Sequence, residues 1–246
     1  MMRLRRVSKH VKDQNWAAVV LDFAIVVAGI LIAFQITSWS EARQDRREEQ
    51  RYLAELATNL KADLTQARAG QQVSLQRLSA AEAILEEAAP GYDRLPFFAA
   101  IGEDLPPLGI VADYPYAHLT SYYFMIISSS TFEELIQTGN IGVLSNRDLV
   151  MELTDYYHRL DRQRGDDDLI LTQAEGMLDW ARENGVGMGD RATLEETVSR
   201  ALTDDEFLGF VKMAGFLANW QYDSLAGIEA EAEELLAAVE AELKDR

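Results

Sequence analysis

The feature that most constrains this chain is an apolar run from Trp16 to Trp39. Its polar members are Asp22, Gln35, Thr37 and Ser38. As a helix, the 23 steps of the run would rise about 35 Å, slightly more than the roughly 30 Å hydrocarbon core of a bilayer. The two tryptophans would then lie at opposite interfaces, where amphipathic rings are enriched. The run predicts a transmembrane helix over residues 16–39, with Trp16 and Trp39 as its membrane-interface anchors.

Two other structures could account for the same run. One is an apolar helix buried in the core of a soluble protein. The other is a cleaved signal peptide, because Ser38-Trp39-Ser40 loosely resembles a small-x-small cleavage site. The run is longer than the apolar region of about 7 to 15 residues that is usual in such a peptide. We therefore favour an uncleaved signal anchor.

Basic residues flank both ends of the run in nearly equal number. Five precede it and four follow it closely: Arg3, Arg5, Arg6, Lys9 and Lys12, then Arg43, Arg46, Arg47 and Arg51. The positive-inside rule therefore gives a small preference only, and a short basic tail is the harder end to translocate. We expect residues 1–15 to form a basic cytoplasmic tail. Residues 40–246 should then form a periplasmic domain of a protein of the bacterial inner membrane.

The two parts of the chain differ in charge. Residues 1–39 hold five basic and two acidic side chains, whereas residues 40–246 hold eighteen basic and thirty-nine acidic ones. Such an acidic domain repels nucleic acid, so no nucleic-acid partner is expected. The chain has no cysteine, which excludes disulfides and thiolate chemistry.

Leucines at spacings of three and four predict one long helix over residues 41–88, continuing from the apolar run. Charged residues fill its other faces, so the helix should bury a single stripe. Pro90 and Gly91 are expected to end it. Residues 90–118 hold all five prolines of the chain and are expected to form a loop.

The spacing S/T-x-x-D/E, in which a hydroxyl and an acid cap backbone amides reciprocally, recurs in the second half. The pairs are Thr131 with Glu134 (or Ser130 with Glu133), Ser145 with Asp148, and Thr203 with Glu206. They predict a short helix that Gly139 ends, a second helix that follows it, and a final long helix. A further helix is expected over residues 167–183, ended by Asn184-Gly185.

Only residues 121–127, SYYFMII, have the composition of a strand, and they could equally form a buried helical turn. The sequence therefore predicts an all-α fold. A single N-terminal transmembrane helix continues into a long amphipathic helix, and a helical bundle forms the domain outside the membrane. We expect the first and last long helices to pack side by side.

Two segments resemble a known family. They are AGILIAFQITSWSE at residues 28–41 and TFEELIQTGNIGVLSNRDL at residues 131–149. Both are similar to a family of bacterial single-pass membrane proteins of unknown function. In that family the span begins with Gly-Glu, continues with Gly-Ile-Leu-Ile-Ala and ends in Trp-Asn-Glu, and a Thr-x-Glu-Glu-Leu…Gly-Asn segment follows. This chain departs from the pattern at Leu21-Asp22 and at Ser40. The resemblance implies a membrane-anchored architecture and carries no activity.

No residue pattern in the chain predicts a reaction. The histidines His10, His118 and His158 are scattered and lack metal-ligand spacing. Asp166-Asp167-Asp168 lacks the alternating ligands of a calcium loop. Residues 128–130 lack a nucleophile elbow, and GVGMGD at residues 185–190 lacks the ending of a phosphate loop. We expect no enzyme, no cofactor, no metal and no small-molecule substrate.

Asp22 stands out because a carboxylate in the middle of a transmembrane helix costs about 2.5 to 3.5 kcal/mol to insert. It can be a tolerated acid, protonated or hydrated near the interface. It also shares one helical stripe with small and apolar residues: Ala18, Asp22, Ile25, Gly29 and Ala33. Gly29-x-x-x-Ala33 is a small-xxx-small pair that allows another helix to approach closely. We predict that this stripe is a helix-docking face.

These features favour a non-enzymatic accessory or assembly subunit of an inner-membrane complex. Its partners would be the lipid bilayer and other membrane-protein subunits, contacted through the transmembrane helix and the periplasmic helices. The alternative is a periplasmic ligand sensor or signalling adaptor, which a small-molecule pocket would favour. A hydrolase would need a cleft with converging titratable groups, and no motif predicts one.

Overall fold

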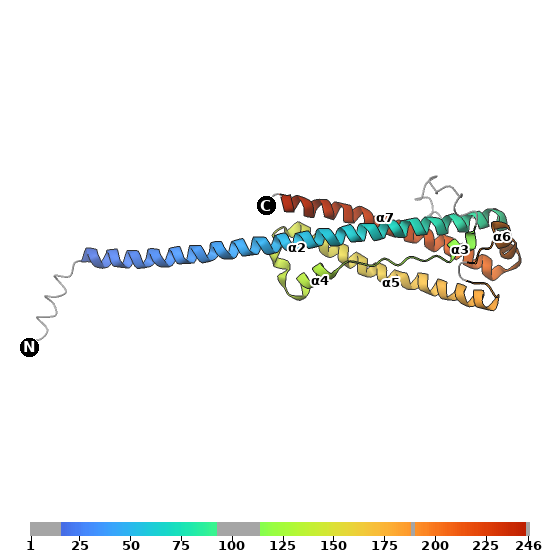
Figure 1. Cartoon of the computed structure of the whole chain (residues 1–246), viewed down its shortest axis with the longest axis horizontal. Helices are drawn as coiled ribbons and strands as arrows, with labels where there is room; N and C mark the ends of the chain where they lie inside the picture. Colours follow the sequence, from blue (N-terminus) through green and yellow to red (C-terminus); the bar gives the residue numbers. More distant parts are fainter. Residues whose placement is uncertain (1–15, 93–113, 188–189, 245–246) are drawn as a thin grey trace, which may run out of the picture. The chain divides into compact units, whose positions relative to one another are not determined.

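The computed structural model describes residues 16–92, 114–187 and 190–244, with side chains from residue 19 onward and without those of residues 164 and 166. Every element among these residues is a helix, and none is a strand (Figure 1). The all-α prediction is therefore confirmed. The chain divides into two compact units, Met1–Gln50 and Arg51–Arg246. The long helix α2, Trp16–Ala88, contributes to both units, so the two helices predicted over residues 16–39 and 41–88 are one element.

The described part of the first unit is the N-terminal part of α2, drawn in blue in Figure 1. It is the helix of the described residues that is long and apolar enough to cross a membrane, and none of its most apolar window is buried. A core helix of a soluble protein would cover that window with neighbouring side chains. The lack of cover disfavours the buried-helix alternative.

The second unit contains three long helices side by side: α2 from residue 51 onward, α5 (Arg147–Glu183) and α7 (Asp205–Lys244) (Figure 1). Lys61 pairs with Glu240 at 2.8 Å, and Arg68 pairs with Glu229 at 2.6 Å. A residue further along α2 therefore pairs with a residue nearer the start of α7. The first and last long helices therefore pack antiparallel, which confirms that they lie side by side.

An extended segment, residues 121–129, returns along the bundle between α2 and α5 (Figure 1). It follows α2 from Arg77, whose guanidinium lies 4.7 Å from the Tyr122 ring, to Asp63, which accepts the Ser128 amide at 2.9 Å. The 14 helical positions span about 21 Å. The six extended positions between Tyr122 and Ser128 span about 20 Å, so the two paths match.

The strand or helical turn considered for residues 121–127 is wrong, because the segment is extended without a strand partner among the described residues. The period-2 pattern of a strand is nevertheless present. Met125 and Ile127 pack against the core, whereas Phe124 and Ile126 are exposed. The neighbours of the segment are helices rather than a strand. Hydrogen bonds from side chains therefore take the place of the backbone hydrogen bonds of a β-ladder. Gln221 donates to the Tyr123 carbonyl at 2.7 Å.

Short helices close the two ends of the bundle. At one end lie α3 (Pro115–Leu119) and α6 (Leu194–Thr203), and at the other lie α4 (Ser130–Gln137) and the 3-10 helix η2 (Asn140–Val143) (Figure 1). The predicted loop over residues 90–118 is thus partly helical at its end, and residues 93–113 lie outside the described part. Helix α6 was not predicted from the sequence, although Thr193 and Glu196 have the S/T-x-x-D/E spacing and form a capping box at its start.

The three predicted capping boxes are wrong, although the helices predicted from them are present. Ser129 precedes α4 and makes no side-chain cap bond. Asn146 caps α5 by accepting the amides of residues 148 and 149, and Asp204 caps α7 by accepting those of residues 206 and 207. In the last two cases an Asn or Asp side chain, which caps as well as a hydroxyl, stands one position from the predicted residue.

The helix ends were predicted more accurately than the starts. Gly139 and Gly185 have φ angles of 73° and 68°, in the left-handed region that ends a helix. The predicted helix over residues 167–183 is wrong in its start, because α5 continues without a break from Arg147 to Glu183.

The core consists of two hydrophobic clusters with a polar layer between them. In α2 the first cluster ends at Ala67, and the second begins at Ala80. In α7 the second cluster ends at Ala214, and the first resumes at Leu225. The buried polar residues of the intervening turns are Ser74, Arg77, Ser79, Gln163, Gln173, Asn219 and Gln221.

Candidate functional site

The predicted docking face lies on the exposed helix of the first unit. Asp22, Ile25, Gly29 and Ala33 are all exposed, and a β-carbon built at Gly29 would meet nothing within 4 Å. Helical geometry places these residues on one face, as their spacing requires. The side chain of Ala18 lies outside the described residues. The use of this face for docking stays a prediction.

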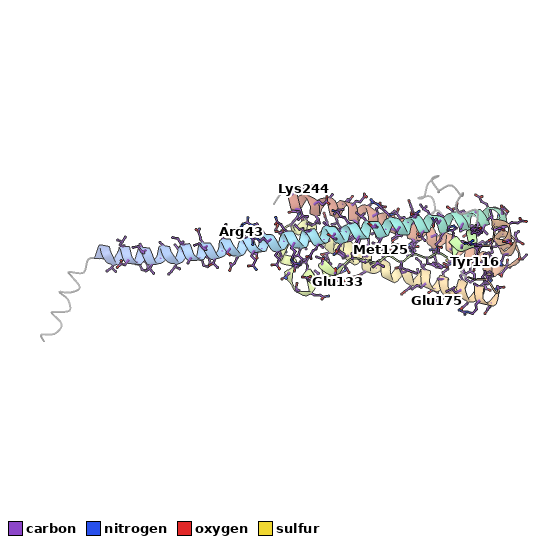
Figure 2. All side chains as sticks on the ribbon, viewed as in Figure 1. Arg43, Tyr116, Met125, Glu133, Glu175 and Lys244 are labelled. Carbon is purple, nitrogen blue, oxygen red and sulfur yellow. The ribbon has the colours of Figure 1, made fainter. Side chains whose placement is uncertain are left out.

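The aromatic anchor at the end of the apolar run is also exposed. Trp39 has 61% of its surface accessible, and the Arg43 guanidinium lies 5.6 Å from its ring centroid. Figure 2 shows the Arg43 side chain among those that radiate around this part of α2. The side chain of the other predicted anchor, Trp16, lies outside the described residues. The anchoring role of both tryptophans stays a prediction.

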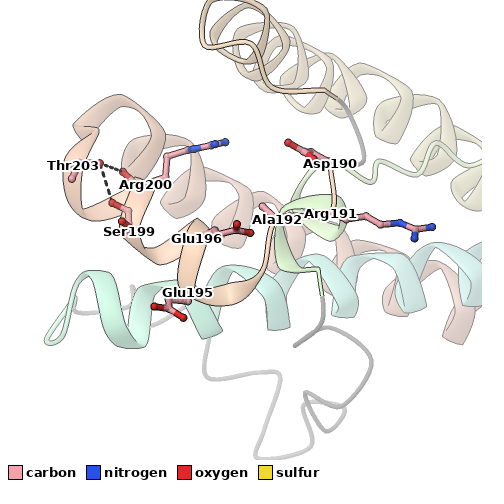
Figure 3. A pocket seen from close by; sticks show the side chains of 8 residues that line it. All are labelled: Asp190, Arg191, Ala192, Glu195, Glu196, Ser199, Arg200 and Thr203. Atoms are coloured by element: carbon pink, nitrogen blue, oxygen red, sulfur yellow. Dashed lines mark hydrogen bonds between the residues drawn. The ribbon is translucent and has the colours of Figure 1, made fainter.

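The second unit has a broad depression of about 670 Å³ beside α6. Its lining is polar and consists of Asp190, Arg191, Ala192, Glu195, Glu196, Ser199, Arg200 and Thr203. In Figure 3 the side chains of Asp190 and Arg200 point toward one another, whereas Arg191 points away. Glu196 caps α6, and the Thr203 hydroxyl donates to the Ser199 carbonyl within the helix. Both of these side chains therefore take part in hydrogen bonds of α6 itself.

A smaller apolar cleft of about 180 Å³ lies between α4 and α5. Phe132 and Ile136 of α4 face Tyr157 of α5 there, and the Phe132 ring stacks on that of Tyr157 at 4.5 Å. Ligand pockets usually measure about 300 to 1,000 Å³. The cleft is therefore small for a metabolite.

A buried carboxylate holds the extended segment against two helices. Asp63 is fully buried and accepts the Ser128 amide at 2.9 Å and the Tyr156 hydroxyl at 3.2 Å. Burial raises the pKa of Asp63, while its two hydrogen bonds oppose that rise. Burial and the neighbouring Asp63 charge raise the pKa of the Tyr156 hydroxyl above its ordinary value. Through these two hydrogen bonds Asp63 of α2 joins the extended segment to α5.

The polar layer contains a buried cation without a carboxylate partner among the described residues. Arg77 has no accessible surface, and its Nη1 donates to Gln221 Oε1 at 3.3 Å. Its Nε and Nη2 have no hydrogen-bond partner in the described part of the chain. Burial lowers the pKa of Arg77 to about 10. No group of three His, Asp or Glu side chains that could hold a metal occurs among the described residues.

The sequence reasoning missed both buried charges, although one signal could have found them. The 3-4 spacing of the leucine stripe in α2 continues through polar residues. Its buried positions are 53, 56, 60, 63, 67, 74, 77, 81 and 84, and Gly70 occupies the remaining position of the repeat. Asp63 and Arg77 therefore stand at core positions of a heptad pattern, which leucines alone did not reveal.

Comparison with known proteins gives one match. A model of the family of unknown function DUF6090 matches residues 22–164, more than half of the chain. The matched region contains most of the apolar run, the rest of α2, the extended segment, α4 and the first half of α5, whereas α6 and α7 lie outside it. No curated protein and no solved structure matches the chain. The chain therefore belongs to DUF6090, a family whose function is unknown.

Proposed function

We propose that this protein is a non-enzymatic, single-pass protein of the bacterial inner membrane that acts as an accessory or assembly subunit of a larger complex. The observation that carries the proposal is the uncovered apolar helix, none of whose most apolar window is buried by the chain itself. Lipid covers most of such a helix. The face of Asp22, Gly29 and Ala33 is the part that suits a protein partner.

Two physical arguments support docking on that face. Gly29 and Ala33 allow two helix backbones to approach closely, which strengthens packing where no hydrophobic effect operates between helices. Asp22 lies on the same face, where a donor from a partner helix could satisfy its carboxylate. A lipid-facing acid would gain no such compensation.

The second unit supports a subunit role better than a sensor role. Its core is filled by two hydrophobic clusters, and its apolar cleft has a volume of about 180 Å³. The sensor alternative requires a ligand pocket, and this cleft is smaller than most. The depression of about 670 Å³ beside α6 is large enough, but its lining is polar, whereas ligand pockets are lined mostly by apolar side chains. We propose that the second unit lies in the periplasm and contacts other subunits through its surface.

The docking face is tested by recovery of co-purifying membrane proteins from mild detergent. Asp22→Leu should insert at least as well as the wild type but lower recovery, by about 3- to 30-fold in affinity, because the partner's donor loses its acceptor. Gly29→Leu should lower recovery further because it separates the backbones. Val27→Leu lies on another face and serves as the matched control. Equal recovery with all three variants would contradict the proposal.

Orientation is tested separately by fusions after Arg246. An alkaline phosphatase fused there should be active and a fluorescent protein that folds only in the cytoplasm should be dark. The reverse result would place the acidic domain in the cytoplasm.

A further inference from the structure

Just beyond Trp39, the charges of α2 are divided between two faces. At about 100° per residue, Arg43, Arg46 and Arg47 share one face with Trp39. The acidic residues of the same turns, Glu41, Asp45 and Glu48, lie roughly opposite. The helix is therefore basic on one side and acidic on the other where the apolar run ends.

This division of charge destabilises the helix locally. Arg43 and Arg47 are four residues apart, as are Glu41 and Asp45, and like charges at this spacing repel. Within the described part of the chain, Arg43, Arg46 and Arg47 form no ion pair. By contrast, the next arginine, Arg51, pairs with Glu55 at 3.0 Å.

The basic side chains point back along the helix toward the apolar run. Side chains on a helix tilt toward its N-terminus. The Arg43 guanidinium accordingly lies 5.6 Å from the Trp39 ring, and Arg46 Nε donates to the Ala42 carbonyl at 3.1 Å. Both contacts reach four residues back, so both side chains lean toward the end of the span.

We propose that Trp39, Arg43, Arg46 and Arg47 form a binding face for the phosphate of anionic phospholipids. The inference rests on the proposed membrane span. With Trp39 at the interface, Arg43 stands about 6 Å and Arg47 about 12 Å further out along the helix. From these positions, side chains that tilt toward the span reach the layer of lipid phosphates. A guanidinium can donate two parallel hydrogen bonds to the oxygens of one phosphate.

Charge also selects the occupant. Residues 40–246 carry thirty-nine acidic and eighteen basic side chains, so most of the domain is repelled by anionic headgroups. The basic face is the part next to the span that attracts them. It would hold the start of the helix at the bilayer surface against that repulsion.

The test uses the full chain purified in mild detergent and native mass spectrometry of its lipid adducts. Phosphatidylglycerol and phosphatidylcholine are titrated separately. The wild type should prefer phosphatidylglycerol, and R43Q/R46Q/R47Q should bind it up to about a hundredfold more weakly, at about fivefold per arginine. The control R147Q/R162Q/K244Q removes the same charge from exposed positions of the second unit and should bind as the wild type does.

Three results would overturn the inference. The first is equal loss in both triple variants, which would assign the effect to net charge. The second is wild-type affinity that is the same for both lipids. The third is displacement of phosphatidylglycerol by an equal concentration of inorganic phosphate, which would indicate a free-anion site.

Alkaline extraction of membranes separates this failure from failure of the proposed function. A wild-type chain that is released by alkali is not anchored, so both proposals fall. A chain that is retained but shows no lipid preference overturns the lipid face alone.

Discussion

The Ser128 amide donates a hydrogen bond to the Asp63 carboxylate across 2.9 Å, although 65 positions separate the two residues. The same carboxylate accepts the Tyr156 hydroxyl from α5 at 3.2 Å. One side chain of α2 thus fixes the end of the extended segment and the neighbouring helix. It does so where the segment passes into α4, whose Thr131 hydroxyl accepts a bond from Asn59 at 3.0 Å.

Asp63→Leu should lower the free energy of unfolding by about 2 to 4 kcal/mol, because the Ser128 amide and the Tyr156 hydroxyl each lose a buried acceptor. Asp63→Asn keeps one acceptor oxygen and should cost far less. Urea unfolding of the full chain in mild detergent, followed by circular dichroism, measures both. Equal losses in the two variants would show that the hydrogen bonds contribute little.

The same carboxylate should make stability depend on pH. Burial raises the pKa of Asp63 above 3.8, so the folded protein holds this proton more tightly than the unfolded chain does. Its contribution to the free energy of unfolding therefore falls as pH rises from the unfolded pKa through the folded one. Because Asp63→Asn cannot titrate, its stability relative to the wild type should increase between about pH 4 and pH 7. A difference that is constant over this range would contradict the prediction.

Gly70→Ala should destabilise the bundle by about 1 to 3 kcal/mol through overpacking. A β-carbon there would lie 2.6 Å from Leu225 Cδ1 and 2.7 Å from Tyr123 Cδ1. Gly227→Ala in α7 is the matched control, because nothing lies within 4 Å of its β-carbon, and it should gain about 0.5 to 1 kcal/mol from helix propensity. Thermal unfolding should therefore move in opposite directions for the two variants.

Asp204→Ala should cost about 1 to 2 kcal/mol at pH 7, because Asp204 caps α7 and also accepts the Trp180 indole N–H at 2.8 Å. Hydrogen bonds lower the pKa of Asp204 below 3.8. Its stabilising contribution is present above that unfolded value and is lost as pH falls through the folded pKa. The difference between Asp204→Ala and the wild type should thus shrink in strong acid, whereas Asp205→Ala should have little effect at any pH.

Arg77→Met should leave the bundle as stable as the wild type or more so. Methionine fills much of the same volume, and the substitution removes a buried guanidinium whose Nε and Nη2 lack partners among the described residues. Arg77→Ala should lose about 2 to 4 kcal/mol because it leaves a cavity. A large loss in Arg77→Met would instead show that the charge itself stabilises the polar layer.

The sequence predicted which segments form the long helices better than it predicted the residues at which those helices start. The leucine period predicted the buried stripe of α2, and Gly139 and Gly185 end helices as expected. Capping signals were off by one residue at Asn146 and Asp204, because neighbouring polar residues compete for the same amides. Tertiary packing decides which of the neighbouring residues caps the helix, and this packing cannot be read from the few residues around the helix start.

The path of residues 121–129 was harder to foresee. Their alternation is that of a strand, yet the partners they find are Gly70, Asp63 and Gln221 on two helices. Nothing local in the segment specifies those partners. The candidate docking face, by contrast, depends only on helical period, so its residues could be placed without the structure.

The antiparallel closure of α7 on α2 has a consequence for biogenesis. Arg68 meets Glu229 and Glu233, which are synthesised 161 and 165 residues later. At a synthesis rate of about 5 to 20 residues per second, the leucine stripe of α2 is not covered by α7 for roughly 8 to 33 s. The apolar run is complete long before that. With the proposed membrane span, insertion would precede closure of the bundle, and the emerging domain would have to avoid aggregation until its last helix is made.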